Sequence, residues 1–201
     1  MSTDIINRVL IKLGENTISD WHQAPYGPKL NIIYNDMLLA LMASYPWRFA
    51  LKRAIISRSV TEVIGHQFKY CFDLPSDCLQ LYQVYEVAKL PNTSNYIYMS
   101  DERYSQENGT ILCNEENELF IRYIYKNEDI SKYPRAFIEA LICKIAAEFV
   151  ATTKNSANAK QIYEQEFSYW ISQAITNNNI AADPESIPDS SWLSVRAEWD
   201  Y

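Results

Sequence analysis

The side chains best suited to nucleophilic or metal chemistry are few in this chain. Its four cysteines lie in apolar runs and form no C-x-x-C pair: Cys71, Cys78, Cys113 and Cys143. The two histidines are His22 and His66. A zinc site of His66, Cys71 and Cys78 would have a spacing that matches none of the usual ligand patterns. We therefore expect reduced thiols in the core, no metal and no cofactor.

Paired carboxylates could act as general acid and general base. The candidates are Glu115 with Glu116, in a predicted turn, and Glu164 with Glu166, on the predicted polar side of a helix. Both settings favour solvated charges. The chain contains no glycine-rich phosphate loop, no G-x-S-x-G and no H-E-x-x-H motif. The sequence favours a protein that is not an enzyme.

The composition is that of a globular protein whose surface is acidic. The 201 residues are 48% hydrophobic, include 15 tyrosines and carry a net charge of −7, which gives no cationic footprint for sequence-specific nucleic-acid binding. An acidic surface would still let DNA slide past without sticking. No apolar run approaches the roughly 20 residues of a membrane span. The N-terminal residues also lack a signal-peptide pattern, so we expect synthesis in the cytosol without a membrane partner.

Residues 44–54 mark the change from helical to strand periodicity. Pro46 cannot continue a helix, because its ring clashes with the preceding turn and it has no N–H to donate. Trp47 and Phe49 follow as large apolar anchors, placed where the two kinds of structure must meet.

Apolar spacing predicts four helices and a series of strands. Helical stripes run over residues 3–13, where Gly14 ends the first helix, and over 28–44, 134–150 and 159–174, with the last helix ending near 177–179. Alternation predicts strands at 52–60, 67–73, 79–87, 96–99, 103–105, 110–113 and 118–125. The turn at 74–77 contains Leu74 and Pro75, and Pro134 stands at the first position of the third helix.

This order predicts an α+β fold: a four-helix bundle-like α domain with an inserted antiparallel β-sheet domain and an extended C-terminal arm. The boundaries are 1–46 for the N-terminal helices, 47–130 for the β domain, 131–179 for the C-terminal helices and 180–201 for the arm. The arm has little periodicity but carries tryptophans. We expect it to dock on a neighbouring surface, or to fold back onto its own helices, through Trp192, Leu193, Arg196 and Trp199.

A series of short motifs follows in order along nearly the whole chain. They are Leu13-Gly14-Glu15, Pro46-Trp47-Arg48-Phe49-Ala50 with Arg53-Ala54, Leu74-Pro75-Ser76-Asp77-Cys78-Leu79, Ile111-Leu112-Cys113-Asn114, Arg122-Tyr123-Ile124, Asp129-Ile130-Ser131-Lys132-Tyr133-Pro134, Glu139-Ala140-Leu141, Ala146-Ala147-Glu148 and Trp192-Leu193-Ser194-Val195-Arg196. In this order the chain resembles the head-to-tail adaptor family of short-tailed bacteriophages, often called tail tubular protein A. It departs at Arg48, where asparagine is common, and at Cys113, where threonine is common.

The resemblance implies a structural virion protein of the phage neck, made in the host cytoplasm. It implies a homo-oligomeric ring of twelve copies between the portal protein and the tail nozzle. DNA would pass through the ring without sequence-specific binding, and tail fibres or spikes would attach to its outside. Two alternatives remain: another neck or tail-completion (stopper) protein, and a virion-associated cell-wall hydrolase.

Overall fold

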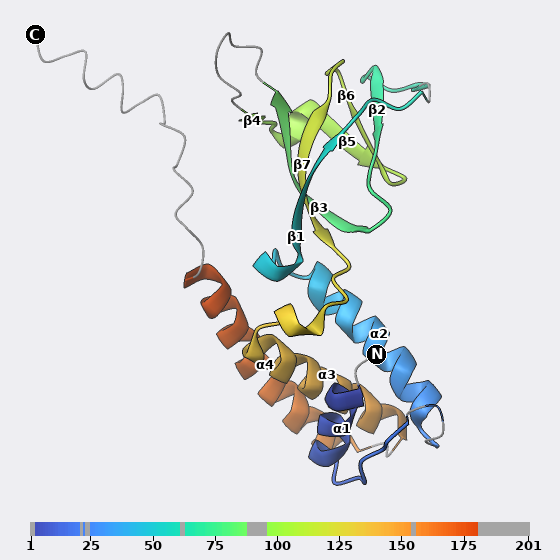
Figure 1. Cartoon of the computed structure of the whole chain (residues 1–201), viewed down its shortest axis with the longest axis vertical. Helices are drawn as coiled ribbons and strands as arrows, with labels where there is room; N and C mark the ends of the chain where they lie inside the picture. The colour runs from blue at the N-terminus through green and yellow to red at the C-terminus, as the bar shows by residue number, and fades with distance from the viewer. Residues whose placement is uncertain are drawn as a thin grey trace, which may run out of the picture.

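The computed structural model of the chain describes residues 3–20, 22, 25–60, 63–87, 96–153 and 156–180. Within these residues, four α-helices pack together at one end of the molecule and seven β-strands at the other (Figure 1). The predicted α+β class is thus confirmed. The four arm residues predicted to form an interface, Trp192, Leu193, Arg196 and Trp199, lie outside the described residues.

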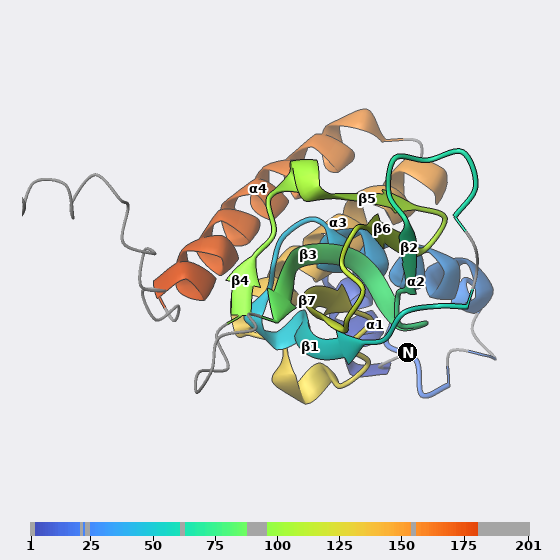
Figure 2. The ribbon, with the colours of Figure 1, turned by 90° about the horizontal axis from the view of Figure 1, so that it is seen from above.

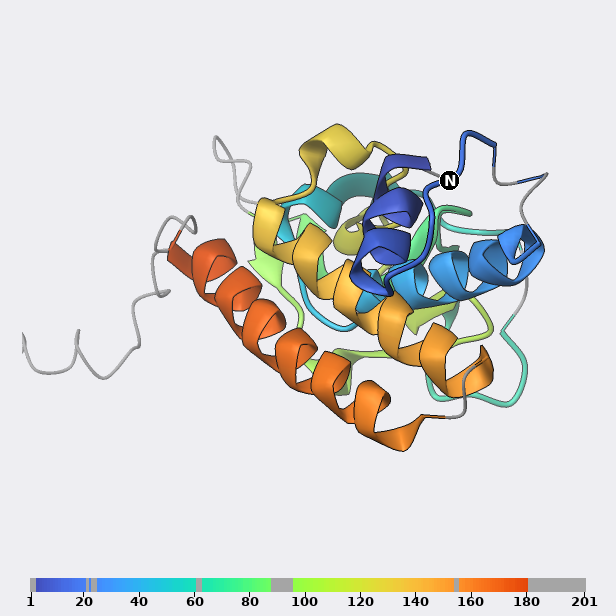
Figure 3. The same cartoon turned by 90° about the horizontal axis from the view of Figure 1, so that it is seen from below.

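Two helices precede the strands and two follow them. They are α1 (Thr3–Lys12), α2 (Gly27–Ala43), α3 (Arg135–Thr153) and α4 (Ala157–Ile180). Helix α3 packs against each of the other three and is buried on most of its circumference. Seen from below, α4 flanks it on one side, and α1 and α2 flank it on the other (Figure 3). An α-helix that is apolar nearly all round is expected at such a central position.

Helix α1 ends where the sequence predicts. Gly14 has a φ of +72°, a conformation that suits glycine because it has no Cβ. The Gly14 N–H donates to the carbonyl of Ile11 at 3.0 Å, and the Glu15 N–H donates to that of Leu10 at 2.9 Å. These two bonds close the last turn of the helix and leave Ile5, Ile6, Val9 and Leu10 buried against the other helices.

The strands form two antiparallel sheets (Figure 2). The larger sheet has the order β1-β7-β3-β4, with β1 at Leu51–Ile56, β7 at Leu119–Tyr125, β3 at Cys78–Val87 and β4 at Tyr96–Tyr98. The smaller has the order β2-β6-β5, with β2 at Tyr70–Asp73, β6 at Thr110–Cys113 and β5 at Tyr104–Glu107. Short 3-10 helices lie at Arg48–Ala50 (η1), Asp101–Arg103 (η2) and Ile130–Lys132 (η3).

Two large hydrophobic clusters form the core. One lies between the sheets and contains Phe72 and Ile111 from the smaller sheet with Val84 and Ile121 from the larger. The other lies among the helices and reaches the end of β7 at Ile124. The larger sheet is therefore shared between a sheet–sheet layer and the helical layer beneath it.

Some local predictions for the strands and for the fourth helix differ from the structure. The strand expected at 52–60 ends at Ile56, and beyond it Arg58 forms only an isolated bridge with Phe72. The strand expected at 67–73 begins only at Tyr70. Ile162, assigned to the packing face of the fourth helix, is 56% exposed. Periodicity identifies an apolar face but cannot tell how much of that face a neighbouring helix covers.

Candidate functional site

The junction between helices and sheet is built around Trp47. Its side chain is fully buried, with its ring centroid 5.2 Å from that of Phe137 on α3. Helix α2 stops at Ala43, so the carbonyls of its last turn lack helical partners. The indole N–H of Trp47 donates to one of them, the carbonyl of Leu41, at 2.7 Å. The predicted anchor thus also caps the helix that precedes it.

Phe49 brings a third segment to the junction. Its ring lies 5.1 Å from that of Tyr133 and 4.8 Å from that of Phe137. Pro134 directly precedes α3 rather than occupying its first position, and its carbonyl accepts the N–H of Ile138 at 3.1 Å. The predicted junction residues before β1 and before α3 therefore meet in space.

Asn127 holds the two chain crossings together. Among the polar and charged residues that the structure describes, Asn127 is the one that is buried, with 2% exposure. Its Nδ2 donates to the carbonyl of Phe49 at 2.7 Å, and its Oδ1 accepts the N–H of Asp129 at 3.0 Å. The Tyr133 hydroxyl donates to the Asn127 carbonyl. The polar groups around the buried Asn127 side chain thus satisfy one another, as a stable interior requires.

The predicted turn with Leu74 and Pro75 lies at the start of β3. The N–H of Cys78 donates to the carbonyl of Pro75 at 2.9 Å, and Leu74 packs against the cluster between the sheets. The turn presents Asp77, whose carboxylate accepts from Lys52 Nζ at 2.7 Å and from the Tyr123 hydroxyl at 3.0 Å.

These contacts shift the pKa values of the groups involved. The hydrogen bond from Lys52 lowers the pKa of Asp77, and the same bond raises the pKa of Lys52. Burial, followed by the bond to Asp77, raises the pKa of Tyr123. All three groups are therefore held in their ordinary charge states near neutral pH.

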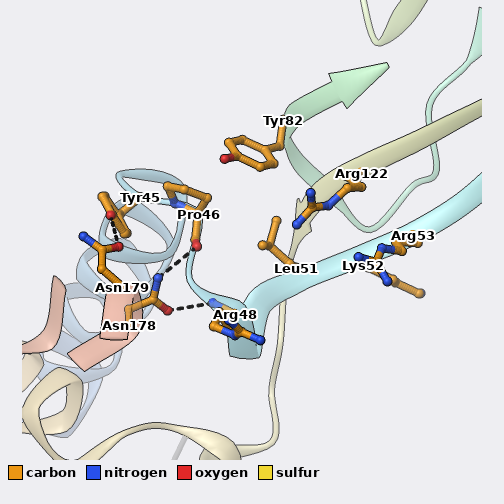
Figure 4. A pocket seen from close by; sticks show the side chains of 10 residues that line it. All are labelled: Tyr45, Pro46, Arg48, Leu51, Lys52, Arg53, Tyr82, Arg122, Asn178 and Asn179. Carbon is orange, nitrogen blue, oxygen red and sulfur yellow. Dashed lines mark hydrogen bonds between the residues drawn. The ribbon is translucent and has the colours of Figure 1, made fainter. Parts of the chain in front are cut away.

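A cleft of about 800 Å³ opens between the end of α4 and the outer face of the larger sheet (Figure 4). On its helical side, the Tyr45 hydroxyl donates to Asn179 Oδ1 at 2.6 Å, and Asn178 accepts the backbone N–H of Arg48 at 2.9 Å. Asn178 Nδ2 also approaches the Pro46 carbonyl at 3.4 Å. The last turn of α4 is thus fastened to the segment that connects α2 to β1.

The sheet side of the cleft is cationic. Arg48 from η1, Lys52 and Arg53 from β1, and Arg122 from β7 all line it, and none of the aspartates and glutamates that the structure describes does. The guanidinium of Arg122 lies 5.5 Å from the ring centroid of Tyr82, a cation–π distance, and donates to Gln83 at 2.8 Å. This concentration of positive charge stands out in a chain whose net charge is −7.

The carboxylates considered for acid–base chemistry lie at the surface, partly exposed, and form ion pairs with basic side chains. Glu164 accepts from Lys144 at 2.9 Å, and Glu166 pairs with Lys12 of α1. Each of these pairs links α4 to another helix. Glu115 accepts from Arg103 at 3.0 Å, and Arg103 also pairs with Glu86 at 2.6 Å and lowers its pKa. Glu116 is exposed.

The four thiols are free cysteines. Burial raises the pKa values of Cys113 and Cys143 to about 11, and burial also raises that of Cys78. A raised pKa leaves little thiolate at neutral pH, so these thiols are poor nucleophiles. Among the described residues, no three side chains of the histidine, cysteine, aspartate and glutamate types are grouped to hold a metal ion. No helix in that part of the chain is long and apolar enough to cross a membrane.

The cleft was not predicted from the sequence. The signal for half of it is present, since Arg48, Lys52 and Arg53 follow one another closely. The other half comes from β7 and from the end of α4, and only the fold brings Arg122, Asn178 and Asn179 to the same place.

A scan against models of known protein families gives no match, and a search of curated proteins finds no significant match to this chain.

Proposed function

We propose that this chain is a subunit of the head-to-tail adaptor of a short-tailed bacteriophage. Twelve copies would form a ring between the portal and the tail nozzle in the neck of the virion. The ring would continue the channel through which DNA passes and give tail fibres or spikes an attachment surface. Its role would be structural and not catalytic.

One observation carries this proposal: motif segments that define the resemblance contact one another in the structure. Phe49, from the P-W-R-F-A segment, packs on Tyr133 from the segment before α3. Asp77, from L-P-S-D-C-L, bonds to Lys52 and to Tyr123 of the R-Y-I segment. These segments are far apart in sequence, and their contacts support the interpretation that the motif segments belong to one structural unit.

The outer helices also suit a ring. A closed ring needs two different surface patches on each subunit, because its interfaces are head-to-tail. Helices α4 and α2 flank α3 on opposite sides (Figure 3). On α4, Ile162 is 56% exposed and Tyr169, seven residues later on the same face, is 59% exposed. On α2, Ile32 is 62% exposed. Exposed apolar side chains on two opposite sides of the helical layer are therefore available to neighbouring copies.

Deletion of the gene in a phage that encodes this chain tests the proposal. We expect heads that package DNA but lose it and carry no tail nozzle, and we expect a plasmid copy of the gene to restore tailed particles. Complete tailed particles that adsorb but fail to penetrate the cell wall would contradict the proposal and favour the hydrolase.

A further inference from the structure

The outer face of the larger sheet brings two arginines together. Arg53 on β1 is directly opposite Arg122 on β7 in the antiparallel register. Side chains of such a pair point to the same face, and like charges at this position repel each other. Both residues line the cleft, with Arg48 and Lys52 beside them. An anionic group in the cleft would relieve this repulsion.

The acids of the described residues do not neutralise this site. Lys52 is paired with Asp77, but the side chains of Arg48 and Arg53 have no carboxylate within ion-pair distance in the part of the chain that the structure describes. Arg48 and Arg53 are also exposed. The cleft thus keeps a positive charge that a partner of opposite charge can use.

The chain itself contains a segment of opposite charge. Residues 181–201, which we call the acidic segment, contain five acidic residues, one basic residue, Arg196, and a net charge of −4. The acids are Asp183, Glu185, Asp189, Glu198 and Asp200. The segment follows Ile180, the last residue of α4, and the residues just before it, Asn178 and Asn179, line the cleft.

The connection is short enough for docking within one chain. A chain advances at most about 3.5 Å per residue, so Asp183 lies within roughly 10 Å of Ile180 and Glu185 within about 18 Å. A tether of this length gives a local concentration in the millimolar range, which makes even a weak contact occupied. Asp183 and Glu185 are thus the acids of the segment that follow most closely on the cleft residues Asn178 and Asn179.

The cleft continues into an apolar row that suits the rest of the segment. Two residues along from the arginine pair, Ile55 is opposite Phe120 on the same face of the sheet. The row extends through Tyr85, whose ring lies 5.4 Å from that of Phe120, to Tyr98. Ile55 and Tyr98 are 56% and 51% exposed. Trp192 and Leu193 would find an apolar surface there.

We propose that the acidic segment docks in the cleft of its own chain, with Asp183 and Glu185 beside Arg53 and Arg122 and with Trp192 on the row from Ile55 to Tyr98. This contact is independent of the ring, and it also occurs in the isolated subunit.

Zero-length carbodiimide cross-linking of the full chain, followed by peptide mass mapping, tests this contact. Of the described residues that line the cleft, Lys52 is the one with an amine that can react. We expect an amide between Lys52 and Asp183 or Glu185 in the monomeric fraction. The ion pair of Lys52 with Asp77 should also cross-link and serves as an internal control for the reaction.

Matched variants establish the role of charge. Lys52→Arg keeps the positive charge and should abolish the cross-link. Arg53→Glu replaces an exposed ion pair by a repulsive pair of like charges. It should lower the yield of the cross-link roughly threefold or more. Lys69→Glu makes the same reversal at an exposed position that is not part of the cleft and should leave the yield unchanged.

Mixing chains of natural isotopic composition with ¹⁵N-labelled chains identifies the occupant. Cross-linked peptides within one isotopic composition support docking in the chain's own cleft. Mixed pairs would show that a second copy supplies the segment and would overturn the proposal. A Lys52–Asp77 cross-link without any link to the acidic segment would also overturn it. Neither result bears on the adaptor proposal, which depends on assembly with the portal.

Discussion

The side-chain amide of Asn127 donates to the backbone carbonyl of Phe49 at 2.7 Å inside the protein. Phe49 lies where the chain leaves the helices for β1, and Asn127 lies where it returns from β7. This bond therefore joins the two crossings between the helical layer and the strands. It fixes the geometry of the junction between the helical layer and the larger sheet.

Replacement of Asn127 by leucine should destabilise the protein. The substitution leaves the Phe49 carbonyl without its partner inside the protein, at a cost of about 1–3 kcal/mol, while water can replace the partner of the exposed Asp129 N–H. Urea unfolding followed by circular dichroism measures the change. The same substitution at exposed Asn117 should change the free energy of unfolding by less than about 0.5 kcal/mol. Equal effects at both positions would contradict the role of the junction bond.

The ion pair of Asp77 with Lys52 should contribute to stability in a pH-dependent way. The folded-state pKa of Asp77 is below the ordinary value of 3.8, so its contribution to stability is present above that value and is lost as the pH falls through the folded pKa. The folded pKa of Lys52 is raised above 10.5, so its contribution is lost only at strongly alkaline pH.

Asp77→Asn separates this effect from other carboxylates. The stability difference between the parent and the variant should be constant from about pH 5 to 9 and should shrink below about pH 4. Both side chains are partly exposed, so salt should also reduce the difference. Unfolding midpoints measured at each pH provide the test, and a difference that grows as the pH falls would contradict it.

The buried thiols should react slowly in the folded protein. A pKa of about 11 instead of 9 lowers the thiolate fraction of Cys113 and Cys143 roughly 100-fold at pH 8. We expect Cys78, which is only half-buried, to react first with an aromatic disulfide reagent, and all four thiols to react at once in denaturant. Fast reaction of Cys113 or Cys143 in native buffer would contradict the burial described.

Much of the fold follows from sequence pattern because its elements are locally encoded. Gly14 ends α1, and Pro46 ends the helical periodicity before β1. The apolar face around Phe137 and Leu141 identifies the central helix. The division of the strands into two sheets was not predicted. Pairing of β2 with β6 joins residues about 40 positions apart, and local alternation carries no information about that choice.

Of the candidate site, the sequence predicted the aromatic junction but not the cationic cleft. Trp47 and Phe49 can be recognised from the sequence, because they are large apolar side chains where helical periodicity changes to strand periodicity. The arginine pair cannot be recognised this way, because Arg53 and Arg122 are 69 residues apart and become neighbours only through the register of β1 with β7. The partners of Glu164 and Glu166 were missed for the same reason, since Lys144 and Lys12 reach them from other helices.

A charge on the exposed face of α4 should weaken the ring without harming the subunit. Ile162→Glu places a carboxylate in the proposed apolar patch, and a buried unpaired charge at an interface costs several kcal/mol. We expect normal thermal stability of the isolated chain and loss of assembly in sedimentation. Ile64→Glu is the matched control, because Ile64 is 90% exposed and lies in a loop away from the helices. Normal assembly of the Ile162 variant would exclude this face from the ring interface.

The mass of the chain with and without the portal protein of the same phage tests the central claim most directly. Before mixing, native mass spectrometry at low and high concentration should show a species that contains only the 23.4 kDa chain. After mixing, it should show a portal complex that carries twelve copies of the chain. A chain that stays at the mass of one subunit and does not bind the portal under any of these conditions would contradict the adaptor account.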